Sequence, residues 1–551
     1  MASAPTPKHT ASTGVTADTA DKACTVQKDL RFWMIVVALA ATSLLVALEV
    51  TIVSTGAATI VAQLGGQSSY VWIPAAYLLA LTSLQPLFGQ FAEVFGRRWP
   101  FILSICVFML GSGVCGGANS MAMLIAGRAI QGIGGAGVNV LAELIVCDLV
   151  PLRARGSIMA IVFGASALGP AVGPVIGGAI VQQSTWRWIF YINLPLGAVG
   201  LGLTVLFLRM RNDNKTGFTR SLARIDWTGN VIFVAACTSI LIATTWGGTV
   251  YPWTSARVLV PLIVGLVGII GFIVFEGLPK LAPNPIVPHH LFGNRTTIIV
   301  FFNTFLQGII VIAILYFLPV YFQAVLLSSP GRSGVQLLPM VMLQIVGAIV
   351  GGGLLQKLGH YHALHAVSFG GSVLGVGLLS VLDPFSSAAE WAPFQVILAI
   401  ALGLGIPIML PVAQARLQDS DAANSTALWG FLRAFGMVWG SVIPAAAFNN
   451  RFVELAPSRI TDPAVRATFA GQGQALEHAV ATAIKALPEP SRSEVISVFS
   501  DSLKRTWYVL MAFPALAFVL VFFMEKVELR KELDTAYGME KGPEKSENTG
   551  V

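Results

Sequence analysis

Long apolar runs decide what this chain can fold into. Hydropathy windows find fourteen of them, each roughly 20 residues long and separated by polar segments. A run of that length crosses a bilayer as an α-helix, whereas a β-barrel strand needs only about ten residues. The chain has 551 residues, 55% of them hydrophobic, and a mean hydropathy of +0.75. The sequence therefore predicts an all-α polytopic membrane protein with a lipid bilayer as its solvent.

The spans are expected in two groups of six, with two more between them. Glycines stand seven residues apart in the loop after the second span, at Gly89 and Gly96, and again after the tenth, at Gly352 and Gly359. This correspondence predicts two repeated bundles. The expected spans are 33–55, 71–91, 99–118, 121–147, 156–181, 188–208, 228–247, 257–276, 297–324, 335–356, 366–382, 393–415, 424–448 and 506–525.

These spans divide the chain into five regions. The tails are rich in small or charged residues, which favours disorder. We expect a cytoplasmic N-terminal tail (1–31), a six-helix bundle (32–210), a linker with two extra helices (211–296), a second six-helix bundle (297–525) with an outer loop (449–505), and a cytoplasmic C-terminal tail (526–551).

The distribution of Lys and Arg predicts the orientation. An even number of spans puts both termini on one side of the membrane. If that side is the cytoplasm, the short inner loops are rich in basic residues, while the short outer loops hold only Arg187, Arg257 and Arg332. The positive-inside rule therefore places both termini in the cytoplasm. The excess of 34 basic over 27 acidic residues is a membrane signal, so we expect no nucleic-acid partner.

The loop after the second span, GQFAEVFGRR, combines two glycines with three charged residues. Glycine allows a tight turn and close approach of helices, and the charges can bond to a neighbouring helix end. The alternative is an ordinary basic loop on the inner face. We predict a conformational latch formed by Gly89, Glu93, Gly96, Arg97, Arg98 and Asp148.

The fifth span contains the segment GPAVGPVIGG. Glycines four residues apart make one smooth helix face on which a partner helix can pack, and the prolines remove backbone donors. Gly347 and Gly351 in the tenth span have the same spacing, so a contact between the bundles could form there. Ordinary small-residue packing is the alternative. The candidate residues are Gly169, Pro170, Gly173, Pro174, Gly177 and Gly178.

Four ionisable residues lie inside the predicted spans, Glu49, Arg128, Glu143 and Arg433. Each costs about 2.5–3.5 kcal/mol to insert, so such residues are functional candidates. A carboxyl surrounded by hydrocarbon can bind and release a proton as access alternates, which makes Glu49 the candidate proton carrier, with Arg128 tuning it. The alternative for Glu49 is a structural ion pair. Glu143 fits a structural or latch role, and Arg433 either locks helices or lines the cavity.

Polar side chains among the apolar spans are candidates for the walls of a substrate cavity. A roomy, mostly apolar cavity needs only a few directional contacts. The candidates are Gln85, Gln131, Asn139, Asn303, Gln307 and Arg433. The five cysteines show no C-x-x-C spacing, so we expect neither a metal site nor a disulfide.

These motifs together resemble the major facilitator superfamily, in particular its fourteen-helix drug:proton antiporters of the fungal efflux-pump type. GQFAEVFGRR is similar to the family's loop signature, Arg128 to its fourth-helix signature and GPAVGPVIGG to its antiporter signature. Further similarities are LEVTIVSTGAATI, WRWIFYINLP, IDWTGN, LPVYFQAV and FLRAFG. Glu49 and Glu93 stand where the family usually has Asp, which keeps the charge and lengthens the reach.

The resemblance implies alternating access and export of small amphipathic compounds, such as drugs, toxins or secondary metabolites, driven by inward proton flow. We expect a monomer in the plasma membrane, or in the vacuolar membrane, with the proton gradient as its energy source and no cofactor. An importer, for example of an iron chelate, would use the same fold. An enzyme is disfavoured because no P-loop, H-E-x-x-H helix or similar catalytic motif is present.

Overall fold

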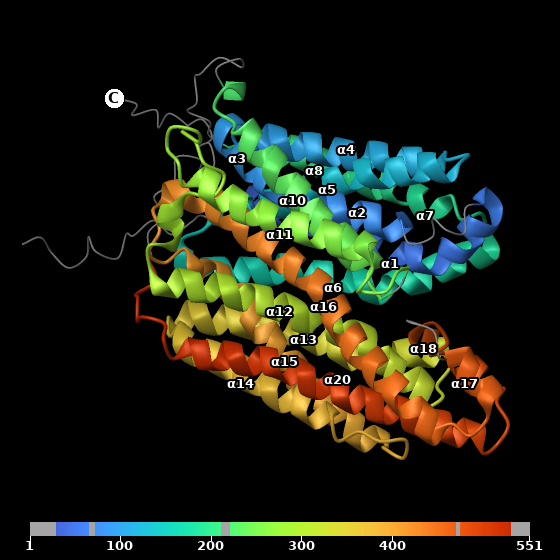
Figure 1. Ribbon diagram of the computed structural model, residues 1–551. Helices are drawn as coiled ribbons and strands as arrows, with labels where there is room; N and C mark the ends of the chain where they lie inside the picture. The colour runs from blue at the N-terminus through green and yellow to red at the C-terminus, as the bar shows by residue number, and fades with distance from the viewer. Residues whose placement is uncertain (1–28, 66–71, 211–220, 249, 470–473, 531–551) are drawn as a thin grey trace, which may run out of the picture.

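The protein is a bundle of long helices. The computed structural model describes residues 29–65, 72–210, 221–248, 250–469 and 474–530 (Figure 1). Over these residues thirteen helices are long and apolar enough to cross a membrane. A further crossing is made by α2 (Trp72–Ser83) and α3 (Gln85–Phe95), which are separated only by Leu84. The expected all-α fold is confirmed. The outermost parts of both predicted tails lie outside the described residues.

The helices form two bundles joined by a hairpin. The N-terminal half also contains α1 (Leu30–Leu64), α4 (Arg98–Gly116), α5 (Met121–Leu149), α6 (Leu152–Gln183), α7 (Trp188–Tyr191) and α8 (Asn193–Phe207). The C-terminal half contains α12 (Arg295–Val320), α13 (Pro330–Leu358), α14 (Tyr361–Leu379), α15 (Ala388–Ala413), α16 (Ala422–Arg459) and α20 (Ser491–Val521).

Helix contacts repeat from one half to the other. In the N-terminal half α1 packs against α6, α4 against α5, and α2 against α5. In the C-terminal half α12 packs against α16, α14 against α15, and α13 against α15. These are the same pairs when α1, α2 with α3, α4, α5 and α6 are matched in order to α12, α13, α14, α15 and α16. The contacts thus follow the internal repeat that the glycine spacing predicts.

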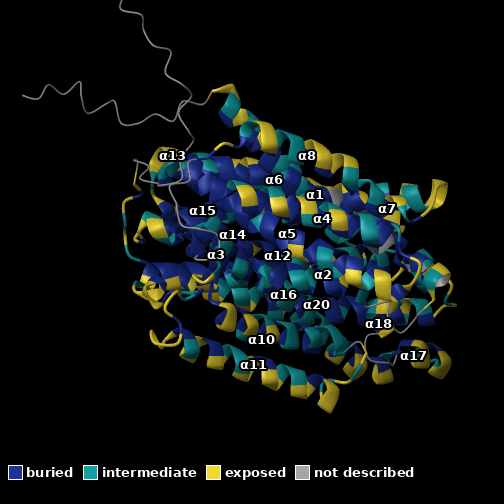
Figure 2. Ribbon diagram, turned by 90° about the horizontal axis from the view of Figure 1, so that it is seen from above, coloured by how far each residue is buried: buried dark blue, intermediate teal, exposed yellow. Residues whose placement is uncertain are grey.

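The hairpin between the halves is made of α10 (Trp227–Trp246) and α11 (Ala256–Glu276). On the inner side α10 contacts both α2 and α16, and the rings of Phe233 and Phe431 meet with centroids 4.8 Å apart. On the outer side α11 is largely exposed (Figure 2), as expected for a helix that faces lipid. The hairpin therefore lies against one side of the interface between the halves.

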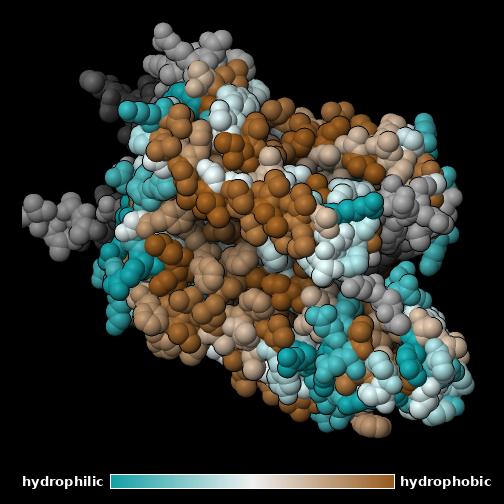
Figure 3. All heavy atoms as spheres, in the orientation of Figure 1, coloured by the Kyte–Doolittle hydropathy of each residue, from teal (hydrophilic) through white to brown (hydrophobic). Residues whose placement is uncertain are grey.

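The two ends of the bundle differ. Both described ends of the chain, Asp29 and Arg530, lie at one end, which we call the terminal end; the opposite end is the far end (Figure 1). The hydrogen bonds that join the halves gather at the terminal end, on α3, α5 and α6 and on α13, α15 and α16. Toward the far end the bundles diverge, and the surface is indented between them (Figure 3). The molecule is closed at the terminal end.

The C-terminal half differs from its prediction at the far end. The segment 449–505, expected as a loop, is mainly helical, because α16 continues to Arg459 and α20 begins at Ser491. Between them stand the short helices α17 (Pro463–Phe469), α18 (Gln474–Glu477) and α19 (Ala481–Lys485). Hydropathy missed these extensions, which pack through an aromatic cluster that starts at the end of a predicted span and is formed by Phe448, Phe452, Phe469 and Phe499.

Candidate functional site

A buried ion pair lies inside the N-terminal half. Glu49 is in the middle of α1 and Arg128 one to two turns into α5, and Arg128 Nη1 donates to Glu49 Oε1. Their side chains are 0% and 1% exposed. A pair so buried is stable only if its remaining polar atoms are also bonded. The structure thus joins the two residues predicted for proton coupling.

Neighbouring polar groups complete the bonding of this pair. Asn193 donates to the second oxygen of Glu49, and Arg128 also donates to Gln131 Oε1 at 2.8 Å and to the Ile73 carbonyl at 2.9 Å. The ring of Tyr77 lies 4.4 Å from the Arg128 guanidinium carbon, a cation–π distance. Both carboxylate oxygens therefore have donors while Glu49 is ionised.

The glycines of α6 pack against α1 beside Glu49. A Cβ on Gly169 would lie 2.6 Å from the Leu48 nitrogen, and one on Gly173 would lie 2.2 Å from Thr51 Oγ1. The partner of this face is therefore α1 of the same half, whereas Gly347 and Gly351 pack against α15. Gly178 has open space beside it, Pro170 is half-buried and Gly177 buried. The side chain of Pro174 lies outside what the structure describes.

The repeated glycines bring the two halves together at the terminal end. A Cβ on Gly352 of α13 would lie 2.4 Å from the Gly156 carbonyl oxygen of α6. A Cβ on Gly89 of α3 would lie 2.5 Å from the Ala427 Cβ of α16. In the repeat α3 corresponds to α13 and α16 to α6, so these contacts are symmetry-related. Each half thus contributes one glycine to a close crossing of helices.

The second glycine of each copy ends its helix. Gly96 has φ of +79° and Gly359 has φ of +70°, which a residue with a side chain rarely adopts. The degenerate second copy has therefore kept both geometric roles of the first, although His360 replaces its charged pair.

The charged residues of the predicted latch act in two places. Arg97 Nε donates to Asp148 Oδ2 at 2.7 Å within the N-terminal half, as expected. Glu93 instead reaches the other half, where Asn424 Nδ2 donates to it at 3.2 Å. Arg98 Nη2 donates to the Val205 carbonyl at 3.0 Å. The loop thus ties its own half together and also contacts α16.

Further polar bonds join the halves at this end. The buried Arg155 donates to Gln414 Oε1 at 2.7 Å, and Ser157 donates to Gln356 Oε1 at 2.7 Å. Arg153 donates to the last carbonyls of α13, at Gln356 and Lys357. Helix C-termini favour such a cation. The sequence analysis did not single out Arg155 or Gln414, because only the packed halves bring them together.

A second intramembrane ion pair crosses the interface. Arg433 Nη2 of α16 donates to Glu143 Oε1 of α5, and the two side chains are 20% and 3% exposed. The Arg433 guanidinium also lies 4.3 Å from the ring of Trp429 and 5.1 Å from that of Phe163. Of the two alternatives for Arg433, the structure therefore favours one that holds helices together, across the halves.

The predicted cavity residues do not form one group. Gln131 belongs to the buried Glu49 network, Asn303 bonds the Ala517 carbonyl of α20, and Gln307 bonds the Leu402 carbonyl of α15. These three bond within their own halves in this structure, and their role in a substrate cavity stays a prediction. Polar character alone does not tell which side of a helix faces a neighbour. Gln85 lies at the interface, and Asn139 is half-buried one turn from Glu143.

The sequence analysis missed two residues that contact the Glu49 pair. Asn193 lies in the segment WRWIFYINLP, which was noted for its resemblance but given no role, and Tyr77 was not considered. A polar residue near the start of an apolar span was the available signal for Asn193. Within the described residues no group of His, Cys, Asp and Glu is placed to hold a metal ion.

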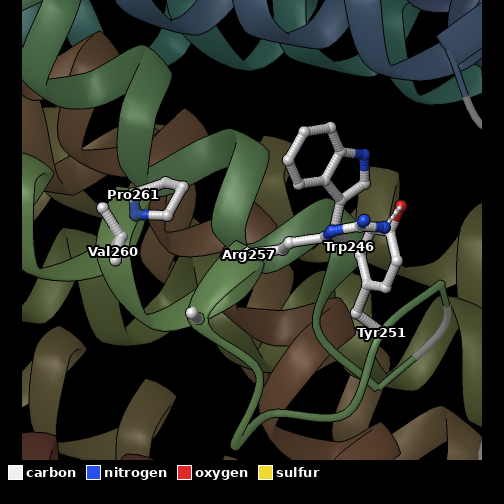
Figure 4. Close-up of a pocket in the computed structure, with 6 residues that line it drawn as sticks. Trp246, Tyr251, Arg257, Val260 and Pro261 are labelled. Carbon is white, nitrogen blue, oxygen red and sulfur yellow. Dashed lines mark hydrogen bonds between the residues drawn. The ribbon is translucent and has the colours of Figure 1, made fainter.

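A shallow hollow of about 550 Å³ lies on the linker hairpin (Figure 4). Arg257 donates to the Tyr251 hydroxyl at 2.7 Å, with Trp246 beside them, and Val260 and Pro261 line the hollow on the other side of Arg257. Aromatic and basic residues at the end of a span are typical of membrane interfaces. The hollow is therefore an anchoring region and is separate from both ion pairs.

Comparison with known proteins gives consistent matches over most of the chain. The family model described as Major Facilitator Superfamily matches residues 39–441. The MFS-type transporter gkaD of Penicillium citrinum is 47% identical over 536 residues, which cover 97% of this chain and 91% of that protein. The MFS-type efflux pump LUC4 of a Fusarium species is 42% identical over 529 residues, covering 95% and 93%.

Solved structures share the fold. The proton:xylose symporter XylE superposes with a TM-score of 0.57 at 12% identity, over 91% of this chain and 98% of that one. A bacterial homologue of the human lysosomal transporter Spinster, in an inward-facing and occupied conformation, superposes with a TM-score of 0.52 at 15% identity, over 92% and 99%. At these identities the comparison speaks to the fold alone.

Proposed function

Because this chain belongs to the Major Facilitator Superfamily and is a membrane transporter rather than an enzyme, we propose that it exports small amphipathic molecules in exchange for protons. Relatives named as efflux pumps support the direction of transport. The terminal end is then cytoplasmic, with both chain termini inside, in the plasma membrane or else the vacuolar membrane. The transporter works as a monomer and uses the proton gradient in place of a cofactor.

The observation that carries this proposal is the fully buried Glu49–Arg128 pair. An ionised carboxylate at this depth is stabilised by Arg128 and by Asn193, so adding a proton removes the charge that holds this network together. In the proposed cycle Glu49 takes a proton from the outer side and releases it to the cytoplasm. Protonation favours the inward-facing state, in which new substrate enters.

α6 connects the proton site with the interface between the halves. Its middle packs on α1 at Leu48 and Thr51, which flank Glu49, and its terminal end carries Gly156 and Arg155. A rearrangement of α1 around a protonated Glu49 would therefore displace α6, which packs directly against it. This continuity supports coupling of the proton to the opening of the terminal end.

The proton gradient supplies enough energy for export. One proton moving through 100 mV yields about 2.3 kcal/mol before any pH difference is counted. Each tenfold concentration ratio costs about 1.4 kcal/mol, so one proton supports roughly a fiftyfold substrate gradient.

Reconstituted transport tests this function. The purified full-length protein is placed in proteoliposomes, and a panel of amphipathic compounds is screened in two assays. The first measures accumulation driven by an imposed pH gradient, and the second measures counterflow without a gradient. The Glu49→Gln variant should keep counterflow and lose gradient-driven accumulation. Glu454→Gln, a carboxylate-to-amide change at an exposed position, is the matched control and should behave as the parent.

Two results would refute the proposal. If accumulation by the parent protein does not depend on the pH gradient, transport is not coupled to protons. Undiminished gradient-driven accumulation by Glu49→Gln would remove Glu49 as the carrier. Accumulation in the direction opposite to export would instead support the importer.

A further inference from the structure

We propose that Glu143 is a second proton-binding site, and that a proton there releases the tie between the two halves. This inference rests on the proton-coupled transport proposed above and adds a separate carboxyl to it. The site lies on the same helix as Arg128, α5, but at the terminal end and between the halves.

Glu143 is only partly hydrogen-bonded. Its Oε1 accepts from Arg433, whereas its Oε2 is buried without a hydrogen-bond partner. The side-chain oxygen of Gln85, from α3, is also buried and unpartnered. Buried polar atoms are rarely left unbonded, so each such atom calls for an explanation.

The two unpartnered oxygens face the same place. A Cβ on Gly430 of α16 would lie 2.7 Å from Gln85 Oε1 and 3.6 Å from Glu143 Oε2. Both oxygens thus lie against Gly430, and two acceptors that share one place lack a donor hydrogen. A proton on Glu143 Oε2 supplies it, because the resulting O–H can donate to Gln85. A rotated Gln85 amide would also supply a donor, and the experiment below separates the two.

The internal repeat relates this crossing of helices to a second one without such charges. Matching Gly89 to Gly352 places Gln85 opposite Ala348, and matching Gly156 to Ala427 places Arg433 opposite Val162. The symmetry-related crossing of α6 and α13 thus closes with apolar residues at these positions. An ion pair at these positions is therefore not needed to close the interface. Its presence on one side only, at the cost of desolvating two charges, indicates another role.

Other ionisable groups lie on the elements that meet at this part of the interface. Among the described residues they include Asp148 and the Cys147 thiol on α5, Glu93 on α3, Arg155 on α6, and Asp226 and Glu276 on the hairpin whose α10 contacts α16. Of these carboxylates and Glu143, it is Glu143 that pairs with a charged residue of the other half. Asp148 is paired with Arg97, Glu93 with Asn424 and Arg155 with Gln414.

The proton step follows from this geometry. A proton binds Glu143 Oε2 and stays there, so the carboxyl becomes neutral, and the new O–H donates a hydrogen bond to Gln85 Oε1. Arg433 keeps its charge but loses its counter-charge. The ion pair between the halves thus becomes a hydrogen bond from a charged donor to a neutral carboxyl, without the attraction between opposite charges. The terminal end then opens more readily.

Distance measurements between the halves test this inference in the Glu49→Gln background, where the first proposed proton site is absent. Spin labels are placed at Trp99→Cys and Leu358→Cys, exposed positions on α4 and α13 at the terminal end, in full-length protein whose native cysteines are replaced. The distance distribution is recorded between pH 5 and pH 8. Glu454→Gln serves as the control for a neutralised surface carboxylate.

With a second proton site, the Glu49→Gln protein still shifts toward long distances on acidification, while Glu49→Gln with Glu143→Gln stays at long distances at every pH. Gln85→Leu, which removes the acceptor, should move the midpoint of opening about half to one pH unit lower. Glu143→Asp, which keeps the carboxyl, should preserve the response and covers the case in which Glu143→Gln does not fold.

A distance distribution in Glu49→Gln that ignores pH would overturn the inference, because Glu143 would then stay ionised as a structural partner of Arg433. An unchanged midpoint in Gln85→Leu would overturn the shared proton. Neither result bears on Glu49, whose role depends on the gradient-driven transport of the single Glu49→Gln variant, so the two proposals fail separately.

Discussion

The two ion pairs of α5 have the same chemistry in opposite settings. Arg128 and Glu143 lie 15 positions apart on one helix, which is about 22 Å along its axis. The Glu49–Arg128 pair is enclosed in one half, and both oxygens of its carboxylate have donors. The Glu143–Arg433 pair crosses between halves, is partly exposed through Arg433 and leaves one oxygen unbonded.

This difference separates two tasks that an alternating-access transporter has to combine. A fully bonded pair inside one half acts on the other half only indirectly, through the helix α6 that packs beside it. A pair across the interface changes the balance between closed and open states whenever its charge changes. The glycine contacts follow the same division, since Gly169 packs within a half and Gly352 packs between halves.

The largest expected effect is on the enclosed pair. Arg128→Ala leaves Glu49 buried without its counter-charge and should lower the free energy of unfolding by about 3–5 kcal/mol. Arg433→Ala should cost only about 1–2 kcal/mol, because the halves can part and let water reach Glu143. Thermal unfolding in detergent measures both, and equal losses would erase the distinction between the two settings.

The next effect concerns the contact inside the N-terminal half. Gly169→Ala forces a methyl group against the backbone of α1 and should destabilise the protein by about 1–3 kcal/mol. Gly178→Ala, on the same helix with open space beside it, is the matched control and should cost less than about 0.5 kcal/mol. A Gly169→Ala protein that melts like Gly178→Ala would show that α1 and α6 are less tightly packed than described.

The contact between the halves should respond differently. Gly352→Ala meets the Gly156 carbonyl only when the terminal end is closed, so it should shift the closed-to-open ratio about tenfold toward open, or about 1.4 kcal/mol. The melting temperature should change little. Gly353→Ala, which has nothing within 4 Å, is the control for the distance measurement between labels on α4 and α13. An unchanged ratio would place the pivot elsewhere.

The smallest effect is expected at the rim of the interface. Ser157→Ala removes a hydroxyl that can donate either to Gln356 Oε1 or to the Gly352 carbonyl; water can reach this half-buried position and replace the bond, so the closed-to-open ratio should fall only about twofold. The same distance measurement checks this value. A shift as large as that of Gly352→Ala would mean that polar bonds rather than helix shape close this end.

The membrane spans and the internal repeat could be predicted from the sequence. A helix that crosses lipid needs a long apolar run, and a close helix crossing needs glycine, so both features are visible in the chain itself. The sequence also indicated Glu49 and Arg128 as functional candidates, since placing a charged side chain inside an apolar span costs free energy. It could not pair Arg433 with Glu143, which are 290 positions apart and meet only after both halves have packed. Hydropathy likewise could not see that α16 and α20 extend beyond their apolar parts, where Phe452 and Phe499 pack together.

The close crossings at Gly89 and Gly352 have a consequence for how such a protein can be tuned. The helices approach closely there because glycine has no side chain. Glycine therefore offers no charge to titrate and no rotamer to change. At the interface between the halves, glycines thus set the shape of the contact, and polar residues set the strength of the bonds across it. In the proposed mechanism, protonation of Glu143 weakens the bond between the halves, while the packed surfaces of the helices keep the same shape.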